Sequence, residues 1–212
     1  RAMRFLSLDS HVPELAAAHV GAAEAAIGTA DWTAAIANLD RALQTSGNAA
    51  SLRRVRGAVY LASKQYDKAI ADLGESLNAE RLSAESYTLR GVAQLGRRDW
   101  ARALEDFDNA MALAPTAHRH TLRAWTYIRM GRPADGLADA DRAIQIQKEL
   151  GSANAARGLI LNAVGQRDEA VRNLSRAVRS TPSLEEASDN LRKIQIERGP
   201  SDQKPIDVDA EP

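Results

Sequence analysis

Residues 84–116, AESYTLRGVAQLGRRDWARALEDFDNAMALAPT, decide the fold of this chain. Within this segment Gly91, Ala103 and Ala110 are small, and Trp100, Leu104, Phe107 and Met111 are large. The large residues recur three and four positions apart, which places them on one face of a helix. The segment therefore predicts two amphipathic helices joined by a short turn, with the small residues where the helices touch.

The same spacing recurs along the chain. Positions equivalent to Gly91 follow one another at intervals of 34, 34, 33 and 34 residues. All fifteen small positions hold Gly, Ala or Ser, and they are Ala23, Gly57, Gly91, Ala124, Gly158, Ala35, Ala69, Ala103, Gly136, Ala170, Ala42, Ser76, Ala110, Ala143 and Ala177. A period of about 34 residues is the signature of a helical repeat array. We predict five repeats covering 169 of the 212 residues: 16–49, 50–83, 84–116, 117–150 and 151–184.

The segments outside the repeats have different compositions. We expect residues 1–15 to form an N-terminal arm and residues 185–199 to form a helix that caps the array. Before this helix, Ser183 and Glu186 have the spacing of a capping box, in which each side chain bonds the other residue's backbone N–H. Residues 200–212 contain prolines and acidic residues, which predicts a flexible tail.

The pattern of small and large positions resembles the tetratricopeptide repeat (TPR), a helix-turn-helix unit of about 34 residues. This resemblance implies an all-α fold, a right-handed α-solenoid of five TPR-like repeats with a C-terminal capping helix. The sequence departs from the family in the aromatic position of the turn. That position holds Trp32, Tyr66 and Trp100 in the first three repeats, but Ala134 and Arg167 in the last two.

A charge pattern follows the same register. An arginine precedes the first small position in repeats two to five, and sixteen residues later stands an aspartate or, once, an asparagine. The pairs are Arg56 and Asp72, Arg90 and Asp106, Arg123 and Asp139, and Arg157 and Asn173. Because a guanidinium group matches a carboxylate, we predict that Arg–Asp pairs bridge the two helices of repeats two to four. An anion-binding site is the alternative interpretation of these arginines.

Composition restricts the class of function. The chain has 28 basic and 28 acidic residues and no cysteine, and residues 200–212 carry four acids and one lysine. This balance does not indicate a nucleic-acid surface, and the absence of cysteine excludes disulfides and thiol chemistry. No apolar run approaches the roughly 18 residues that span a bilayer, and no secretory signal is visible. Since the chain begins at Arg1, the sequence leaves both a cytoplasmic and an exported location open.

In TPR arrays the first helices of successive repeats line a concave groove, and the resemblance implies which residues here would contact a peptide. We expect these to be Arg54, Glu85, Thr88, His118, Thr121, Leu122, Trp125, Arg129 and Asn162. Trp125 is the strongest candidate, because tryptophan and arginine are enriched in binding hot spots and Arg129 lies one turn away. The alternative is that Trp125 packs against the next repeat, and the sequence does not distinguish the two.

Other ligands find less support. The family's carboxylate clamp, which grips the C-terminal carboxylate of chaperone tails, needs a lysine and two asparagines in the first two repeats and basic residues in the third. This chain has Val20, Glu24 and Val55 and then Glu85 and Leu89 at those positions. The clamp is therefore absent. His118 and His120 lie about 200° apart around a helix, which does not favour one shared metal. No nucleophile motif or phosphate loop is present, so we expect no catalytic residue, metal or cofactor.

The sequence thus predicts a non-enzymatic scaffold for protein–protein interaction, which binds an extended peptide or a partner helix in the concave groove. The alternative is a structural subunit or assembly factor of a larger complex, with contacts on its convex or end surfaces. The expected partner is a protein or peptide and not a nucleic acid, although helical repeats can read RNA bases. Self-association through the C-terminal tail stays open.

Overall fold

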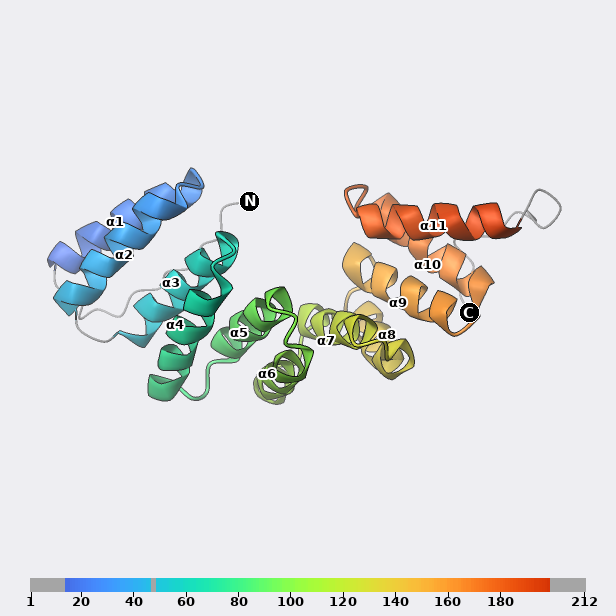
Figure 1. Ribbon diagram of the computed structural model, residues 1–212, viewed down its shortest axis with the longest axis horizontal. Coiled ribbons are helices and arrows are strands. Elements are labelled where there is room, and N and C mark those ends of the chain that lie inside the picture. The colour runs from blue at the N-terminus through green and yellow to red at the C-terminus, as the bar shows by residue number, and fades with distance from the viewer. Residues whose placement is uncertain (1–13, 47–48, 199–212) are drawn as a thin grey trace. The chain divides into compact units, whose positions relative to one another are not determined.

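The computed structural model describes residues 14–46 and 49–198 (Figure 1). Most of the predicted N-terminal arm and the whole predicted tail lie outside this part of the chain. The described residues form helices and no strand, which confirms the all-α class. The helices are α1 (Glu14–Gly28), α2 (Trp32–Ser46), α3 (Ala50–Ala62), α4 (Tyr66–Ala79), α5 (Ala84–Gly96), α6 (Trp100–Leu113), α7 (Ala117–Arg129), the 3-10 helix η1 (Pro133–Gly136), α8 (Leu137–Ile146), α9 (Gly151–Ala163), α10 (Arg167–Ser180) and α11 (Glu185–Arg198).

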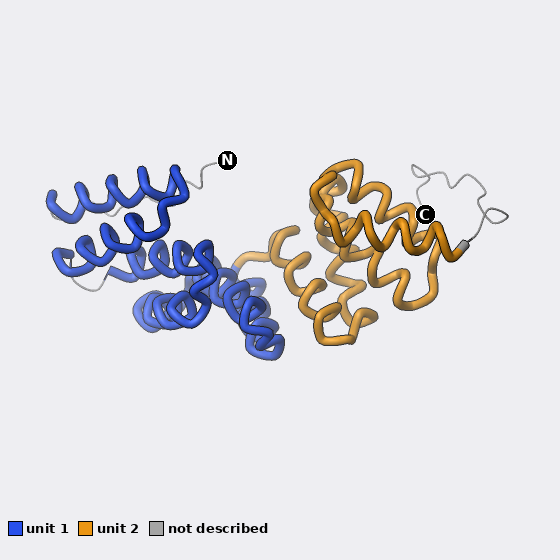
Figure 2. Tube along the Cα trace, turned by 45° about the horizontal axis from the view of Figure 1, so that its top comes forward, with its two compact units in different colours: residues 1–113 blue, residues 114–212 orange. Residues whose placement is uncertain are grey.

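The chain divides into two compact units, Arg1–Leu113 and Ala114–Pro212 (Figure 2). In the first unit each helix from α1 to α6 packs on the next, and α3 also contacts α5. In the second unit α7 packs on η1 and α8, α8 on α9, α9 on α10, and α10 on α11. Helices α7 and α11 both also contact α9. Packing inside each unit is therefore local along the chain, as expected for a repeat array.

The small positions of the repeat are buried in the structure, all fifteen of them. Their size matters because the helices approach closely there. A Cβ atom added at Gly91 would lie 2.7 Å from Cε1 of Phe107, and one at Gly57 would lie 2.7 Å from Cγ of Leu73. The side chains that pack directly against these glycines therefore determine how the two helices of a hairpin pack.

The Arg–Asp pairs predicted for repeats two to four are confirmed. The Nε atoms of the arginines lie 2.6, 2.9 and 2.7 Å from the carboxylates in the pairs Arg56–Asp72, Arg90–Asp106 and Arg123–Asp139. The hydrogen bond to Asp72 raises the pKa of Arg56 above its ordinary value. Burial raises the pKa of Asp106, and the hydrogen bond from Arg90 opposes that shift. The three aspartates are buried, so these pairs join the helices of one hairpin.

Two arginines in this register also bond an aspartate of the preceding helix. Nη1 of Arg56 lies 2.6 Å from Oδ1 of Asp40, on the preceding helix α2. Arg157, which has Asn173 in place of the usual aspartate, donates from Nε to Oδ1 of Asp141 on α8 at 2.6 Å. These two bonds join consecutive hairpins, and the sequence analysis did not predict them.

The turn inside each hairpin has one residue in the left-handed region. These residues are Ala30, Lys64, Arg98, Gly131 and Gly165, with φ between 57° and 85°. They follow the repeat period of 34, 34, 33 and 34 residues. The turn geometry is therefore the same in all five hairpins, although only the last two supply the glycine that this conformation favours.

The fourth hairpin departs from a regular α-helix at its second helix. Pro133–Gly136 form the 3-10 turn η1 before α8 begins, where the sequence predicts a helix of the ordinary kind. A Cβ atom at Gly136 would lie 3.0 Å from the backbone oxygen of Ala124, so glycine permits this close approach. None of the helices in the described ranges is long and apolar enough to cross a membrane.

Candidate functional site

Helix α7 supplies the central residues of the candidate site in the second unit. Thr116 caps this helix by accepting a hydrogen bond from the backbone N–H of Arg119 at 3.2 Å. Trp125, in the third turn, is half-buried and packs against the apolar residues of α9. Its indole N–H donates to the backbone oxygen of Ser152 at 3.2 Å. Trp125 therefore packs against the next hairpin, as one of the two interpretations predicted.

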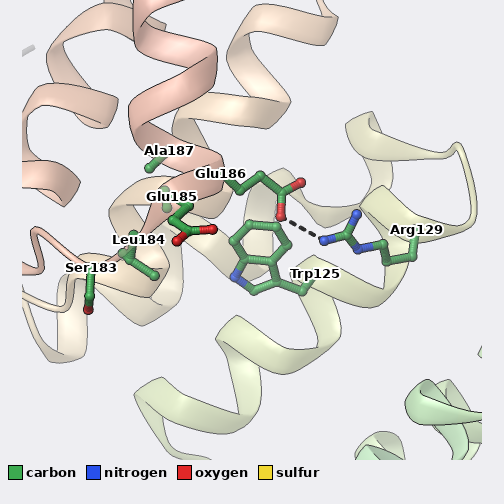
Figure 3. Close-up of a pocket in the computed structure, with 8 residues that line it drawn as sticks. Trp125, Arg129, Ser183, Leu184, Glu185, Glu186 and Ala187 are labelled. Atoms are coloured by element: carbon green, nitrogen blue, oxygen red, sulfur yellow. Dashed lines mark hydrogen bonds and ion pairs between the residues drawn. The ribbon is translucent and has the colours of Figure 1, made fainter.

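The indole also borders an open pocket of about 350 Å³ (Figure 3). Three stretches of chain line this pocket: Trp125 and Arg129 from α7, Ala155 from α9, and Ser183–Ala187 from the entry to α11. Trp125 thus combines packing with exposure to a ligand-sized space. The two interpretations of this residue are compatible with one another.

Arg129 is held in place from two sides. Its Nη2 lies 2.7 Å from Oε2 of Glu186, and its Cζ lies 5.6 Å from the centroid of the Trp125 ring. The second distance is within the range of a cation–π interaction. The Arg129 and Glu186 side chains are 49% and 42% exposed, so solvent screens their ion pair. Glu186 directs its carboxylate to Arg129, which differs from the capping box that the sequence predicts.

Glu185 borders the same pocket without a counter-charge. Figure 3 shows its carboxylate turned toward the indole of Trp125. Within residues 14–46 and 49–198, no ion pair or hydrogen bond engages this carboxylate. Leu184 and Ala187 complete the wall as apolar residues, half-buried and buried respectively. The pocket therefore has a largely apolar lining that includes one unpaired carboxylate.

The other predicted contact residues of the second unit do not line this pocket. Leu122 and Asn162 are half-buried, and His118 is exposed. Desolvation, with a smaller contribution from Arg119, lowers the pKa of His118, which favours the neutral imidazole. Thr121 is only 2% exposed, and its hydroxyl donates to the backbone oxygen of Ala117 at 2.8 Å. Thr121 consequently offers no free hydroxyl to a ligand.

The three predicted contact residues of the first unit lie on α3 and α5. Nη1 of Arg54 lies 3.5 Å from Oε2 of Glu80, and its Nε lies 3.4 Å from Oε2 of Glu85. The Thr88 hydroxyl donates to the backbone oxygen of Ala84 at 2.7 Å. Arg54 and Glu85 are thus brought together, and the charge of the arginine is balanced by its own neighbours.

The sequence analysis missed Ser183–Ala187 as part of the site. Glu186 is 57 residues from Arg129 along the chain, and no repeat period connects the two positions. The only available signal was the pair of adjacent glutamates at the start of an amphipathic helix. In the described ranges, no group of three or more His, Asp or Glu residues is arranged to hold a metal ion.

No protein-family model matches the sequence, and no curated protein matches it. Among solved structures, the chain is similar to MamA from Desulfovibrio magneticus, with a TM-score of 0.73 and 14% identity over 82% of this chain and 98% of that one. It is similar to YrrB, described as a TPR protein with an unusual peptide-binding site, with a TM-score of 0.67 and 18% identity over 91% and 100% of the two chains.

A third similar structure is the first TPR of Spaghetti (RPAP3) bound to an HSP90 peptide, with a TM-score of 0.51 and 23% identity. The match covers 54% of this chain and 91% of that one. Likeness at these identities establishes the fold. The resemblance to tetratricopeptide repeats inferred from the sequence is therefore confirmed for the fold, and the function has to be argued from the site.

Proposed function

We propose that this chain, which has the TPR fold, is a non-enzymatic scaffold that binds a peptide segment or helix of a protein partner. The observation that carries the proposal is the pocket beside Trp125 and Arg129. A half-buried tryptophan next to an exposed arginine has the composition of an interaction hot spot. The pocket is open and its lining is largely apolar, which suits a side chain of a peptide better than a polar metabolite.

Two structural neighbours support a peptide as the ligand. YrrB is described as having a peptide-binding site, and the RPAP3 TPR was solved with the HSP90 peptide SRMEEVD. In this chain the residues Arg54, Glu85 and Thr88 of the first unit and His118, Leu122 and Asn162 of the second are the further proposed contacts. The mode of binding must differ from a carboxylate clamp, because the residues of that clamp are absent.

A peptide-display selection on the immobilised full chain tests this function. We expect recovered peptides to bind the wild type and to lose affinity on Arg129→Ala and Trp125→Phe, two changes that keep α7 helical. Arg142→Ala is the matched control, since Arg142 is an exposed arginine of the same unit that does not line the pocket. Peptides that bind all four proteins equally would place the ligand elsewhere.

A structural subunit of a larger complex is the second candidate function. It is supported by large apolar side chains that stay exposed away from the pocket, such as Leu82 at 83% and Ile196 at 73%. A fixed subunit should self-associate or lose stability when it is isolated, whereas a peptide receptor should be monomeric. Light scattering during size-exclusion chromatography separates these outcomes.

Self-association through residues 200–212 is a distinct proposal, motivated by the four acids of this segment. It predicts that deleting residues 200–212 converts an oligomer into a monomer in the same light-scattering measurement. An unchanged number of protomers after the deletion would contradict this proposal.

A further inference from the structure

The charges around the Trp125 pocket indicate which kind of side chain it accepts. Arg129 contributes one positive charge, and the N-terminus of α11 contributes about half of one. Glu185 and Glu186 together carry two negative charges, so the pocket keeps a negative excess. Because Glu186 already neutralises Arg129 at 2.7 Å, the excess is located at Glu185.

The walls of the pocket suit an aliphatic stem. Trp125, Ala155, Leu184 and Ala187 present apolar surface, and the Glu185 carboxylate stands at the rim (Figure 3). Lysine and arginine side chains bury their methylene groups on such surfaces while keeping the charged end near solvent and a counter-charge. An aromatic face beside the carboxylate adds cation–π attraction.

We propose that this pocket receives a lysine or arginine side chain of the partner, with its methylene groups on Trp125 and Leu184 and its cation beside Glu185. The inference rests on the proposed peptide-binding function and specifies the partner as a basic segment. It excludes an acidic segment, because the only arginine at the pocket is already paired.

The predicted contact residues of the first unit also lie beside an excess of negative charge. This observation is independent of the Trp125 pocket. Arg54 faces two carboxylates, those of Glu80 and Glu85, both about half exposed. The lowered pKa of His118 favours its neutral form. The cations at the proposed contact positions are therefore balanced or exceeded by glutamates in each unit, which favours a basic partner and disfavours an acidic one.

The test uses single-residue probes on the full chain labelled with ¹⁵N. The probes are N-acetyl-lysine methylamide, its uncharged analogue N-acetyl-norleucine methylamide, and N-acetyl-glutamate methylamide. The indole N–H resonance of Trp125 is assigned with the Trp125→Phe variant and followed during titration. We expect a saturable shift with the lysine probe, a weaker one with norleucine, and none with glutamate.

The role of Glu185 is tested by Glu185→Gln, with Glu197→Gln as the control at an exposed glutamate of the same helix outside the pocket. We expect Glu185→Gln to weaken the lysine probe about two- to fivefold, the range of one solvent-exposed ion pair. Glu197→Gln should leave its affinity unchanged. Unaltered helical circular dichroism shows that both variants are folded.

Three results overturn the inference: equal binding of the lysine and norleucine probes, preference for the glutamate probe, or no effect of Glu185→Gln. None of these results removes the proposed function, which the peptide-display selection tests separately. If that selection yields apolar or acidic peptides that depend on Arg129 and Trp125, peptide binding stands and the basic partner is wrong.

Discussion

Gly91 and Phe107 show how single residues adjust the packing of a hairpin. The residue sixteen positions after the first small position packs against it. The pairs are Ala23 and Leu39, Gly57 and Leu73, Gly91 and Phe107, Ala124 and Ala140, and Gly158 and Leu174. The largest partner faces glycine, and the smallest partner faces alanine. The fixed offset therefore keeps the packing partner at the same position in each hairpin, although the size of the residues that fill it varies.

We predict that Gly91→Ala destabilises the protein by about 1 to 2 kcal/mol, because overlap with the buried Phe107 ring outweighs the gain in helix propensity. Gly21→Ala is the control, since a Cβ at Gly21 meets nothing within 4 Å. That variant should gain about 0.5 to 1 kcal/mol. Urea denaturation measures both. Adding Phe107→Leu to Gly91→Ala should recover part of the loss, and equal stability of the two glycine variants would contradict this account.

The two classes of arginine pair differ in energetic role. Arg90→Ala leaves the carboxylate of Asp106, which is 2% exposed, without its main partner. We predict a loss of about 2 to 4 kcal/mol in the free energy of unfolding, less than for a fully buried pair because Arg90 is partly exposed. Arg129→Ala breaks a solvent-screened pair and should cost less than about 1 kcal/mol. Similar losses for the two variants in urea denaturation would refute the distinction.

The Arg–Asp pairs also show what the sequence could and could not predict at this scale. Arg56–Asp72, Arg90–Asp106 and Arg123–Asp139 were predictable because both partners belong to one hairpin and share one offset. The bond of Arg157 to Asp141 was not, because Asp141 belongs to the preceding hairpin. Asp40 and Asp141 stand sixteen residues before their arginines, so the same offset toward the N-terminus predicts both bonds.

Among the elements, the turns inside the hairpins share a geometry that three of them adopt at a cost. Ala30, Lys64 and Arg98 have φ near 60°, where an L-residue with a Cβ is disfavoured by about 1 to 2 kcal/mol. Gly131 and Gly165 occupy the same position without this penalty. Tertiary packing of the two helices therefore imposes the turn on residues that do not prefer it.

We predict that Arg98→Gly stabilises the protein by up to about 1 kcal/mol and that Gly165→Ala destabilises it by a similar amount. Arg97→Gly is the control, because Arg97 has φ of −82° and gains nothing from glycine. Thermal and urea denaturation give the three differences. If Arg97→Gly and Arg98→Gly change stability alike, the sign of φ is not the cause.

Helix α11 is the element whose role the sequence predicted least completely. Its existence follows from its amphipathic pattern, and Ala187 and Ile194 bury that stripe. The sequence does not predict that the first turn of α11 lies against α7. That contact depends on how α9 and α10 pack, because 57 residues separate its two sides. Local spacing in the sequence predicted that Glu186 forms a capping box, whereas in the structure its carboxylate forms an ion pair with Arg129. The candidate site was consequently predicted on one of its sides only.

For the whole molecule, the main consequence of local packing is that the stability of each helix depends on the helices next to it. Each unit has its own apolar clusters, and within each unit most helix packing joins elements that are neighbours or one hairpin apart. In such arrays a change propagates through nearest-neighbour interfaces. Ile160, fully buried on α9, is suited to test this.

We predict that Ile160→Val, which costs about 1 kcal/mol, raises amide exchange rates in α7 to α11 about fivefold. Exchange in α1 to α3 should stay within error, because these helices have their own core around Leu39 and Leu52. Hydrogen exchange followed by mass spectrometry resolves the two sets of peptides. A uniform increase over all described helices would show a single cooperative unit.

The sixteen-residue offsets also define which parts of the chain can be exchanged in chimeras. The hairpins α3–α4 and α9–α10 both seat a leucine against glycine, and both bond an aspartate of the preceding helix through Arg56 or Arg157. They should therefore substitute for one another when the crossover points lie between hairpins. A crossover inside a hairpin would separate Gly91 from Phe107 and join helices whose volumes no longer match. Evolution by duplication faces the same restriction, so the helix pair is the smallest heritable module of this fold.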